Sequence, residues 1–319
     1  FGSSCSQVVM MFQGSMLLGV GMALSLLDII DIRMAGNLII AKFIGALAIR
    51  PAMMVVMGWT QVMSFRESVA DIKEFLGNYR EELGTKTTLP QPEGVLKVIK
   101  VSFSEERTQR TILSGVNFLI NPGNIMVIMG PSGSGKTTLL KLLGGIYTPA
   151  QGSVRLDGVS LSKWNREEIS PHLGYLPQET ELFGGLASDN IARFQRIDNK
   201  KLESAYEEAG IIDLYNNYLE GKDIQLDSDI NLISGGLKQR IGLARAFYGS
   251  PKLLLLDEPT ANLDSGSRLK LIDTIKKYRE RNSLVIVATH DRDLLLLADY
   301  ILIVKSGVQI SFDSREDLM

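Results

Sequence analysis

The sequence predicts an α/β domain preceded by membrane-spanning helices, and three observations lead to this fold class. In the C-terminal part, apolar runs of strand length alternate with helical patterns, as in a mostly parallel sheet covered by helices. A glycine-rich loop stands between one such run and a helical segment. The N-terminal part contains a long uncharged run, Val8–Leu27, close to the roughly 20 residues that span a bilayer.

The first 63 residues differ in composition from the rest of the chain. They contain nine of the twelve methionines but only five of the 70 charged residues. Small residues within Val8–Leu27 favour a transmembrane helix packed against other helices. A signal peptide is the competing interpretation, but no basic region precedes the run. Because the chain has no start methionine and two spans cannot enclose a pathway, we expect it to be the C-terminal part of a longer protein.

A second apolar stretch, Leu38–Met63, is interrupted by Lys42, Arg50 and Pro51. Charges inside a membrane are costly, so these side chains should face a polar interior or other helices. A buried helix of a soluble domain is the alternative. The residues around Pro90 and Pro92 have the composition of a linker.

The glycine-rich loop fits the pattern G-x-x-x-x-G-K-[ST] at every fixed position. It follows the apolar run Ile125–Met129 and precedes an apolar helical pattern. A strand before the motif and a helix after it are the structural context in which this pattern indicates a phosphate-binding loop. Backbone N–H groups of such a loop and of the helix N-terminus bind phosphate oxygens. Lys136 would reach the β- and γ-phosphates, and Thr137 would ligate Mg²⁺. The predicted nucleotide-binding residues here are Gly130, Pro131, Ser132, Gly133, Ser134, Gly135, Lys136, Thr137 and Thr138.

Two acidic residues follow the apolar run Leu253–Leu256. An acid at the carboxyl end of a buried strand is the usual second Mg²⁺ anchor beside a phosphate loop, so Asp257 is expected to hold the ion. Glu258 is placed to accept a proton from the attacking water. We therefore expect residues 1–83 to be transmembrane, residues 84–94 to be a linker and residues 95–319 to form the nucleotide-binding domain.

Charge and cysteine content exclude some functions. The net charge of −2 provides no basic surface, so nucleic acid is not expected as a partner. Cys5 is the only cysteine, which excludes an intrachain disulfide.

Further motifs resemble those of a known family. The stretch from Ile233 to Arg240, ISGGLKQR, resembles the LSGGQ signature of ATP-binding cassette (ABC) proteins. Gln178 matches the family's Q-loop, Asn262-Leu-Asp264 its D-loop and His290 its switch histidine. The resemblance covers residues 95–319, with every motif in the family's order.

The resemblance implies a P-loop NTPase fold with a RecA-like core, an antiparallel β subdomain and a helical subdomain. It implies an ATPase that uses Mg²⁺ and forms a head-to-tail dimer with a second copy. Ser234, Gly235 and Gly236 would face the γ-phosphate bound by the partner, and Asp264 of the D-loop would be a further nucleotide-binding residue. Gln178 would touch Mg²⁺ or the attacking water, and His290 would bond the γ-phosphate and align Glu258.

Three positions depart from the family pattern. Leu237 stands where the signature usually has Gln, which predicts a weaker contact with the opposing ribose, and Ile233 replaces Leu conservatively. Glu105 occupies the position of an aromatic residue that stacks on adenine. Its presence predicts weaker adenine binding and looser base selectivity, unless Phe103 or another ring substitutes.

A membrane segment fused ahead of the cassette resembles an exporter. The stretches from Ser162 to Glu168, Gly174 to Gly185 and Asp189 to Phe194 are similar to type I secretion exporters for proteases and lipases. This resemblance implies a multi-pass protein of the bacterial inner membrane with a cytoplasmic nucleotide-binding domain. A periplasmic adaptor, an outer-membrane tunnel protein and an exported polypeptide would be its partners. A lipid or drug exporter, a soluble cassette ATPase and an inert nucleotide-binding regulator are the alternatives.

Overall fold

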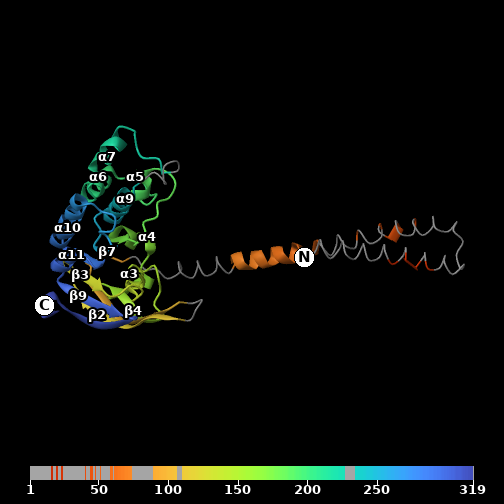
Figure 1. Ribbon diagram of the computed structural model, residues 1–319, viewed down its shortest axis with the longest axis horizontal. Coiled ribbons are helices and arrows are strands. Elements are labelled where there is room, and N and C mark those ends of the chain that lie inside the picture. Colours follow the sequence, from red (N-terminus) through yellow and green to blue (C-terminus); the bar gives the residue numbers. More distant parts are fainter. Residues whose placement is uncertain are drawn as a thin grey trace. The chain divides into compact units, whose positions relative to one another are not determined.

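The computed structural model describes residues 89–105, 110–226 and 234–318, the helical stretch 61–73, and single positions between residues 16 and 59 (Figure 1). The chain divides into two compact units, Phe1–Gly84 and Thr85–Met319. Within the described residues, no helix is both long and apolar enough to cross a membrane. Most of the expected spans Val8–Leu27 and Leu38–Met63 lies outside the described residues, as do residues 84–88 of the expected linker.

The C-terminal unit contains a 10-stranded sheet in the order β5-β4-β1-β2-β10-β9-β3-β8-β7-β6. Its strands are β1 (Leu96–Ser104), β2 (Thr111–Ile120), β3 (Ile125–Met129), β4 (Gln151–Leu156), β5 (Val159–Ser160), β6 (Leu173–Leu176), β7 (Leu253–Asp257), β8 (Leu284–Ala288), β9 (Tyr300–Lys305) and β10 (Val308–Ser314). Strands β9, β3, β8, β7 and β6 pair in parallel, whereas β2, β1, β4 and β5 pair antiparallel.

The central parallel strands are buried on both faces. Every residue of β7 and β8 is buried. Successive side chains of a strand point to opposite faces, so Leu254 and Leu256 join one apolar cluster while Leu253 and Leu255 join another. The continuous apolar runs of the sequence therefore correspond to strands covered on both sides.

The antiparallel part is held by a tight hairpin and by one carboxylate. Asp157 and Gly158 connect β4 to β5, and both have positive φ angles, as a two-residue hairpin requires. The Asp157 carboxylate accepts hydrogen bonds from the backbone N–H groups of Glu93, Gly94 and Val95 at 2.8 to 3.1 Å. The turn thus fixes the chain where it enters β1.

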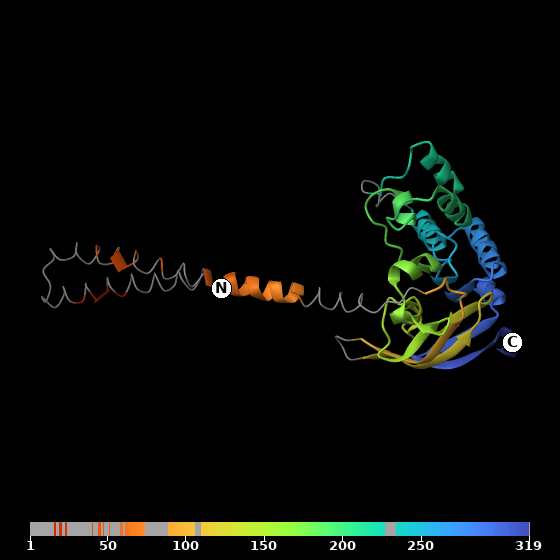
Figure 2. The same ribbon diagram turned by 180° about the vertical axis from the view of Figure 1, so that it is seen from behind.

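Helices cover the sheet and form a separate layer. They are α3 (Lys136–Leu143), α4 (Arg166–Ile169), α5 (Ala187–Ile191), α6 (Asn199–Glu208), α7 (Ile212–Leu219), α9 (Gly235–Phe247), α10 (Ser265–Glu280), α11 (Arg292–Leu297) and α12 (Arg315–Leu318). Helices α5, α6, α7 and α9 gather at one end of the unit, away from β2 and β4 (Figure 1, Figure 2). The expected fold of the C-terminal domain is confirmed: a parallel core, an antiparallel β subdomain and a helical subdomain.

Candidate functional site

The glycine-rich loop joins β3 to α3 in a conformation that strongly favours glycine. Gly130, Gly133 and Gly135 have φ angles of 155°, 75° and 102°, in the region that side chains disfavour. A Cβ atom on Gly130 would lie 2.0 Å from the carbonyl oxygen of Val304, so the loop also passes too close to β9 for any side chain. The loop is therefore built to place its backbone, rather than its side chains, at the site.

Lys136 is the first residue of α3, and its ammonium lies inside the loop. Its Nζ atom donates to the carbonyl oxygens of Gly130 at 2.7 Å and Pro131 at 3.2 Å. The residue is 91% buried, since only 9% of its surface is exposed. A buried positive charge beside loop N–H groups and a helix N-terminus is a site for an anion.

Asp257 ends β7 next to Thr137, which donates a hydrogen bond to it. Burial raises the pKa of the Asp257 carboxyl, although the Thr137 hydrogen bond and the charge of Lys136 partly oppose this shift. Its Oδ2 atom is buried and has no hydrogen-bond partner among the described residues. An unsatisfied carboxylate oxygen beside a hydroxyl fits Mg²⁺, which prefers oxygen ligands and is commonly bound by one or two carboxylates.

Glu258 follows Asp257 with a left-handed backbone, φ 45°, which is rare for a residue with a side chain. Its backbone N–H donates to the carbonyl of Ala288 at 2.9 Å, which fixes the loop against β8. The hydroxyl of Thr289 donates to Glu258 Oε2 at 3.3 Å. Strained backbone at a buried strand end is typical of functional positions, and here it carries the Glu258 side chain into a cleft.

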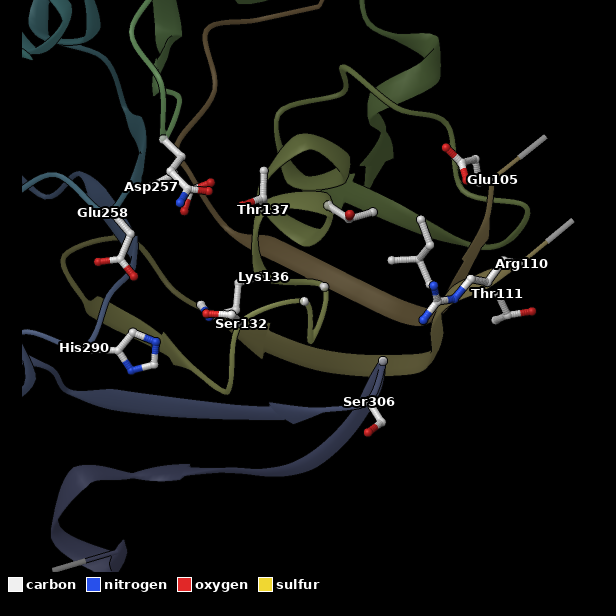
Figure 3. Close-up of a pocket in the computed structure, with 16 residues that line it drawn as sticks. Glu105, Arg110, Thr111, Ser132, Lys136, Thr137, Asp257, Glu258, His290 and Ser306 are labelled. Atoms are coloured by element: carbon white, nitrogen blue, oxygen red, sulfur yellow. The ribbon is translucent and has the colours of Figure 1, made fainter. Parts of the chain in front are cut away.

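These residues line one cleft with a volume of about 590 Å³ (Figure 3). Glu258 and His290 lie near each other at one end, and Gln178 also lines the cleft. Of the residues expected to act on nucleotide or metal, the cleft brings together Ser132, Gly133, Gly135, Lys136, Thr137, Thr138, Gln178, Asp257, Glu258 and His290. Gly130, Pro131 and Ser134 support the same loop without lining the cleft.

The residues of the LSGGQ-like signature do not line this cleft. Ser234 is the exposed N-cap of α9, and its hydroxyl accepts a hydrogen bond from Leu237 N at 3.3 Å. Gly235 and Gly236 follow it, and a Cβ atom on Gly236 would meet the carbonyl oxygen of Asn262 at 2.8 Å. None of the three lines the cleft of its own chain. The Leu237 side chain packs against the apolar cluster of the helical layer, and Ile233 lies outside the described residues.

Asp264 does not line the cleft either. It is the N-cap of α10, and its carboxylate accepts from the Ser267 backbone N–H at 2.7 Å. This hydrogen bond lowers the pKa of the exposed Asp264 carboxyl. The contact that the structure describes for Asp264 is thus a helix cap within the chain.

Several lining residues carry no motif and were missed by sequence reasoning. They are Arg110, Thr111 and Ile112 at the start of β2, and Ser306 and Gly307 between β9 and β10. Thr289 was missed as well, although it stands next to His290. Phe103 does not line the cleft, because its ring is stacked on that of Tyr147 with centroids 5.1 Å apart.

The chain matches an ABC transporter family model and is similar to a secretion protein and to a lipid flippase. Residues 113–261 match the ABC transporter family model. The chain is 34% identical over 285 residues to the type I secretion system ATP-binding protein PrsD of Rhizobium meliloti (strain 1021), covering 89% of this chain and 49% of that protein. It is 30% identical over 239 residues to the ATP-dependent lipid A-core flippase of Burkholderia orbicola (strain AU 1054), covering 75% of this chain and 40% of the flippase.

A solved structure agrees with the sequence matches. The structure of a bacterial Atm1-family ABC exporter with ATP bound superposes with a TM-score of 0.67 at 26% identity, covering 89% of this chain and 50% of that one. The chain spans about half the length of PrsD and of the Atm1-family exporter. With its phosphate loop, acidic strand end and signature helix in the family's arrangement, the chain belongs to the ABC transporter family and carries that family's ATPase domain.

Proposed function

We propose that the chain is the C-terminal part of an ABC exporter subunit that hydrolyses ATP to drive a polypeptide across the bacterial inner membrane. The observation that carries this proposal is the match to PrsD, a type I secretion protein. That match extends over 285 residues, which is longer than the ATPase domain of residues 95–319 alone. The similarity therefore includes part of the apolar N-terminal segment.

Substrate binding begins at the phosphate loop. The backbone N–H groups between Ser132 and Thr138 and the Lys136 ammonium bind the β- and γ-phosphates of ATP. Asp257 and Thr137 hold Mg²⁺, with Gln178 nearby. When bound, Mg²⁺ neutralises charge between the β- and γ-phosphates.

Hydrolysis is assigned to Glu258. Its carboxylate accepts a proton from the water that attacks the γ-phosphorus, a role worth roughly 10²–10⁴ in rate. Thr289 orients this carboxylate through its 3.3 Å hydrogen bond. His290, at the same end of the cleft, bonds the γ-phosphate and aligns Glu258.

The signature helix serves the second copy of the chain. Ser234, Gly235 and Gly236 begin an exposed helix N-terminus outside their own cleft, so they are available to a phosphate held by another chain. The proposed enzyme is a head-to-tail dimer of two copies, with Asp264 as a further nucleotide-binding residue. ATP favours the closed dimer because only that state supplies both halves of the site.

The remaining proposals concern the whole exporter. Residues 1–83 end its transmembrane domain, residues 84–94 are a linker, and residues 95–319 lie in the cytoplasm. A periplasmic adaptor and an outer-membrane tunnel protein complete the pathway, as in type I secretion. The match to a lipid A-core flippase supports a second candidate, in which the exporter moves a lipid or another small amphipathic substrate.

ATPase activity of the chain in lipid, compared between the unmodified protein and Glu258→Gln, tests the proposal. We expect activity that is lost in Glu258→Gln, with ATP binding retained, and that changes when a secreted polypeptide is added. Activity that responds to lipids instead would favour the second candidate. Normal activity of Glu258→Gln would show that Glu258 is not the general base.

A further inference from the structure

The cleft has two chemically different ends. Asp257, Glu258 and His290 lie at one end, Arg110, Thr111 and Ser306 lie at the other, and the phosphate loop runs between them (Figure 3). Under the proposed function, on which this inference rests, the γ-phosphate lies beside Glu258. The nucleoside must then extend along the loop toward Arg110, where the base enters its own subsite.

Among the residues that the structure describes, no phenylalanine, tyrosine or tryptophan lines this cleft. Phe103, two residues before Glu105, is stacked face to face on Tyr147 with an interplanar angle of 1°. The base therefore has no aromatic ring to stack on among the described residues. Its neighbours are instead Glu105, Arg110 and the apolar side chain of Ile112.

Glu105 and Arg110 stand opposite each other where β1 and β2 diverge. The Glu105 backbone N–H donates to the Arg110 carbonyl at 3.0 Å, and the hydroxyls of Ser104 and Thr111 lie 3.3 Å apart across the same strands. These contacts fix the spacing of the two charged residues. Figure 3 shows the Arg110 side chain extending from this point toward the phosphate loop.

A guanidinium can replace an aromatic ring as a stacking surface. It is planar and weakly hydrated, and it stacks on nucleobases. Hydrogen bonds of a guanidinium lie in its plane, so stacking uses the face of the group and does not require its N–H groups to be without partners.

Glu105 supplies a carboxylate, which accepts hydrogen bonds only. Guanine presents two adjacent donors, its N1–H and its 2-amino group, whereas adenine presents one amino group on the corresponding edge. We propose that the base end of this cleft is a charged purine subsite, in which Arg110 stacks on the base and Glu105 accepts from its amino edge, so that GTP is used at least as well as ATP.

The test is a comparison of KM for ATP and GTP in the full chain, with tripolyphosphate inhibition as a measure of phosphate binding alone. We expect KM values for the two nucleotides within about threefold of each other. Arg110→Ala should raise both KM values roughly tenfold, while Arg110→Lys, which keeps the charge but loses the plane, should not restore them. Glu105→Gln should raise KM for GTP several-fold more than KM for ATP.

Tripolyphosphate inhibition should be the same in all these proteins, which shows that the phosphate loop is intact. Unchanged KM values in Arg110→Ala, or an ATP preference above about thirtyfold in the unmodified protein, would overturn the proposal. Binding of the same nucleotides to Glu258→Gln separates it from the proposed function. If binding follows the expected pattern but no protein hydrolyses nucleotide, the subsite stands and the exporter ATPase proposal fails.

Discussion

The hydroxyl of Thr180 donates a hydrogen bond to the amide oxygen of Gln239 at 3.3 Å, and both side chains are buried. The amide nitrogen of Gln239 donates to the carbonyl of Pro259 at 3.4 Å. Thr180 lies two residues after Gln178, and Pro259 directly follows Glu258. The Gln239 side chain on helix α9 therefore connects the loop that carries Gln178 to the loop that carries Glu258, and both loops line the cleft.

Gln239→Met tests this connection, because it keeps the volume of the side chain but removes both hydrogen bonds. We expect kcat for ATP to fall about tenfold with little change in KM, since phosphate binding by the loop is untouched. An unfulfilled buried donor or acceptor costs about 1–3 kcal/mol, so a moderate loss of stability should accompany it. Lys238→Ala, one position earlier on α9, is the control. Full kcat in Gln239→Met would show that the two loops hold their positions without this side chain.

Thr289 is expected to position the general base. Its hydroxyl donates to Glu258 Oε2 at 3.3 Å and accepts from the Asp291 backbone N–H at 3.1 Å, so its orientation is fixed from both sides. Thr289→Val preserves the shape and removes both bonds. We expect kcat to fall about tenfold at constant KM, and Thr289→Ser to restore it. A Val variant as active as the Ser variant would contradict this role.

Tyr278 and Glu208 join α10 to α6 inside the domain. The Tyr278 hydroxyl donates to Glu208 Oε2 at 2.9 Å, and Arg281 pairs with Oε1 at 2.6 Å. Burial and the charge of Glu208 raise the pKa of Tyr278, so the donor persists at alkaline pH. Tyr278→Phe leaves a buried carboxylate oxygen unsatisfied and should lower the free energy of unfolding by about 1–3 kcal/mol. Denaturant unfolding measures this, with Tyr147→Phe as the control at a partly exposed ring.

Much of the core could be predicted from the sequence, because its strands are continuous apolar runs. The run Ile125–Met129 forms β3 with the expected bounds, and the run Leu253–Leu256 lies within β7, which ends one residue later. Strand β6 was not predicted, since Leu173–Leu176 is short, alternates half-buried with buried residues and contains a glycine. A Cβ atom there would lie 2.3 Å from the Ala246 carbonyl, so Gly174 is required by close packing against α9.

The functional site, like the core, could be predicted from the sequence only in part. Lys136, Asp257 and Glu258 belong to local motifs, and such motifs can be recognised in any sequence. Gln239 and Arg110 acquire a role only through contact with segments far along the chain, which a local pattern does not contain. The base end of the cleft was expected to lack its aromatic residue, but the side chains that replace it are visible only once β1 and β2 are paired.

Asp257 combines a functional requirement with a structural cost. Its carboxylate is 1% exposed, and Oδ2 has no partner among the described residues. A buried, unsatisfied charge is unfavourable, whereas a bound Mg²⁺ would compensate it. Asp257→Asn should therefore raise the melting temperature of the nucleotide-free protein by a few degrees and abolish hydrolysis. It should also make ATP affinity insensitive to EDTA, which weakens ATP binding to the unmodified protein. Asp264→Asn, at an exposed helix cap, should leave the melting temperature unchanged. A melting temperature that falls in Asp257→Asn would mean that the carboxylate stabilises the fold through contacts within the chain, and its assignment as a metal ligand would lose its support.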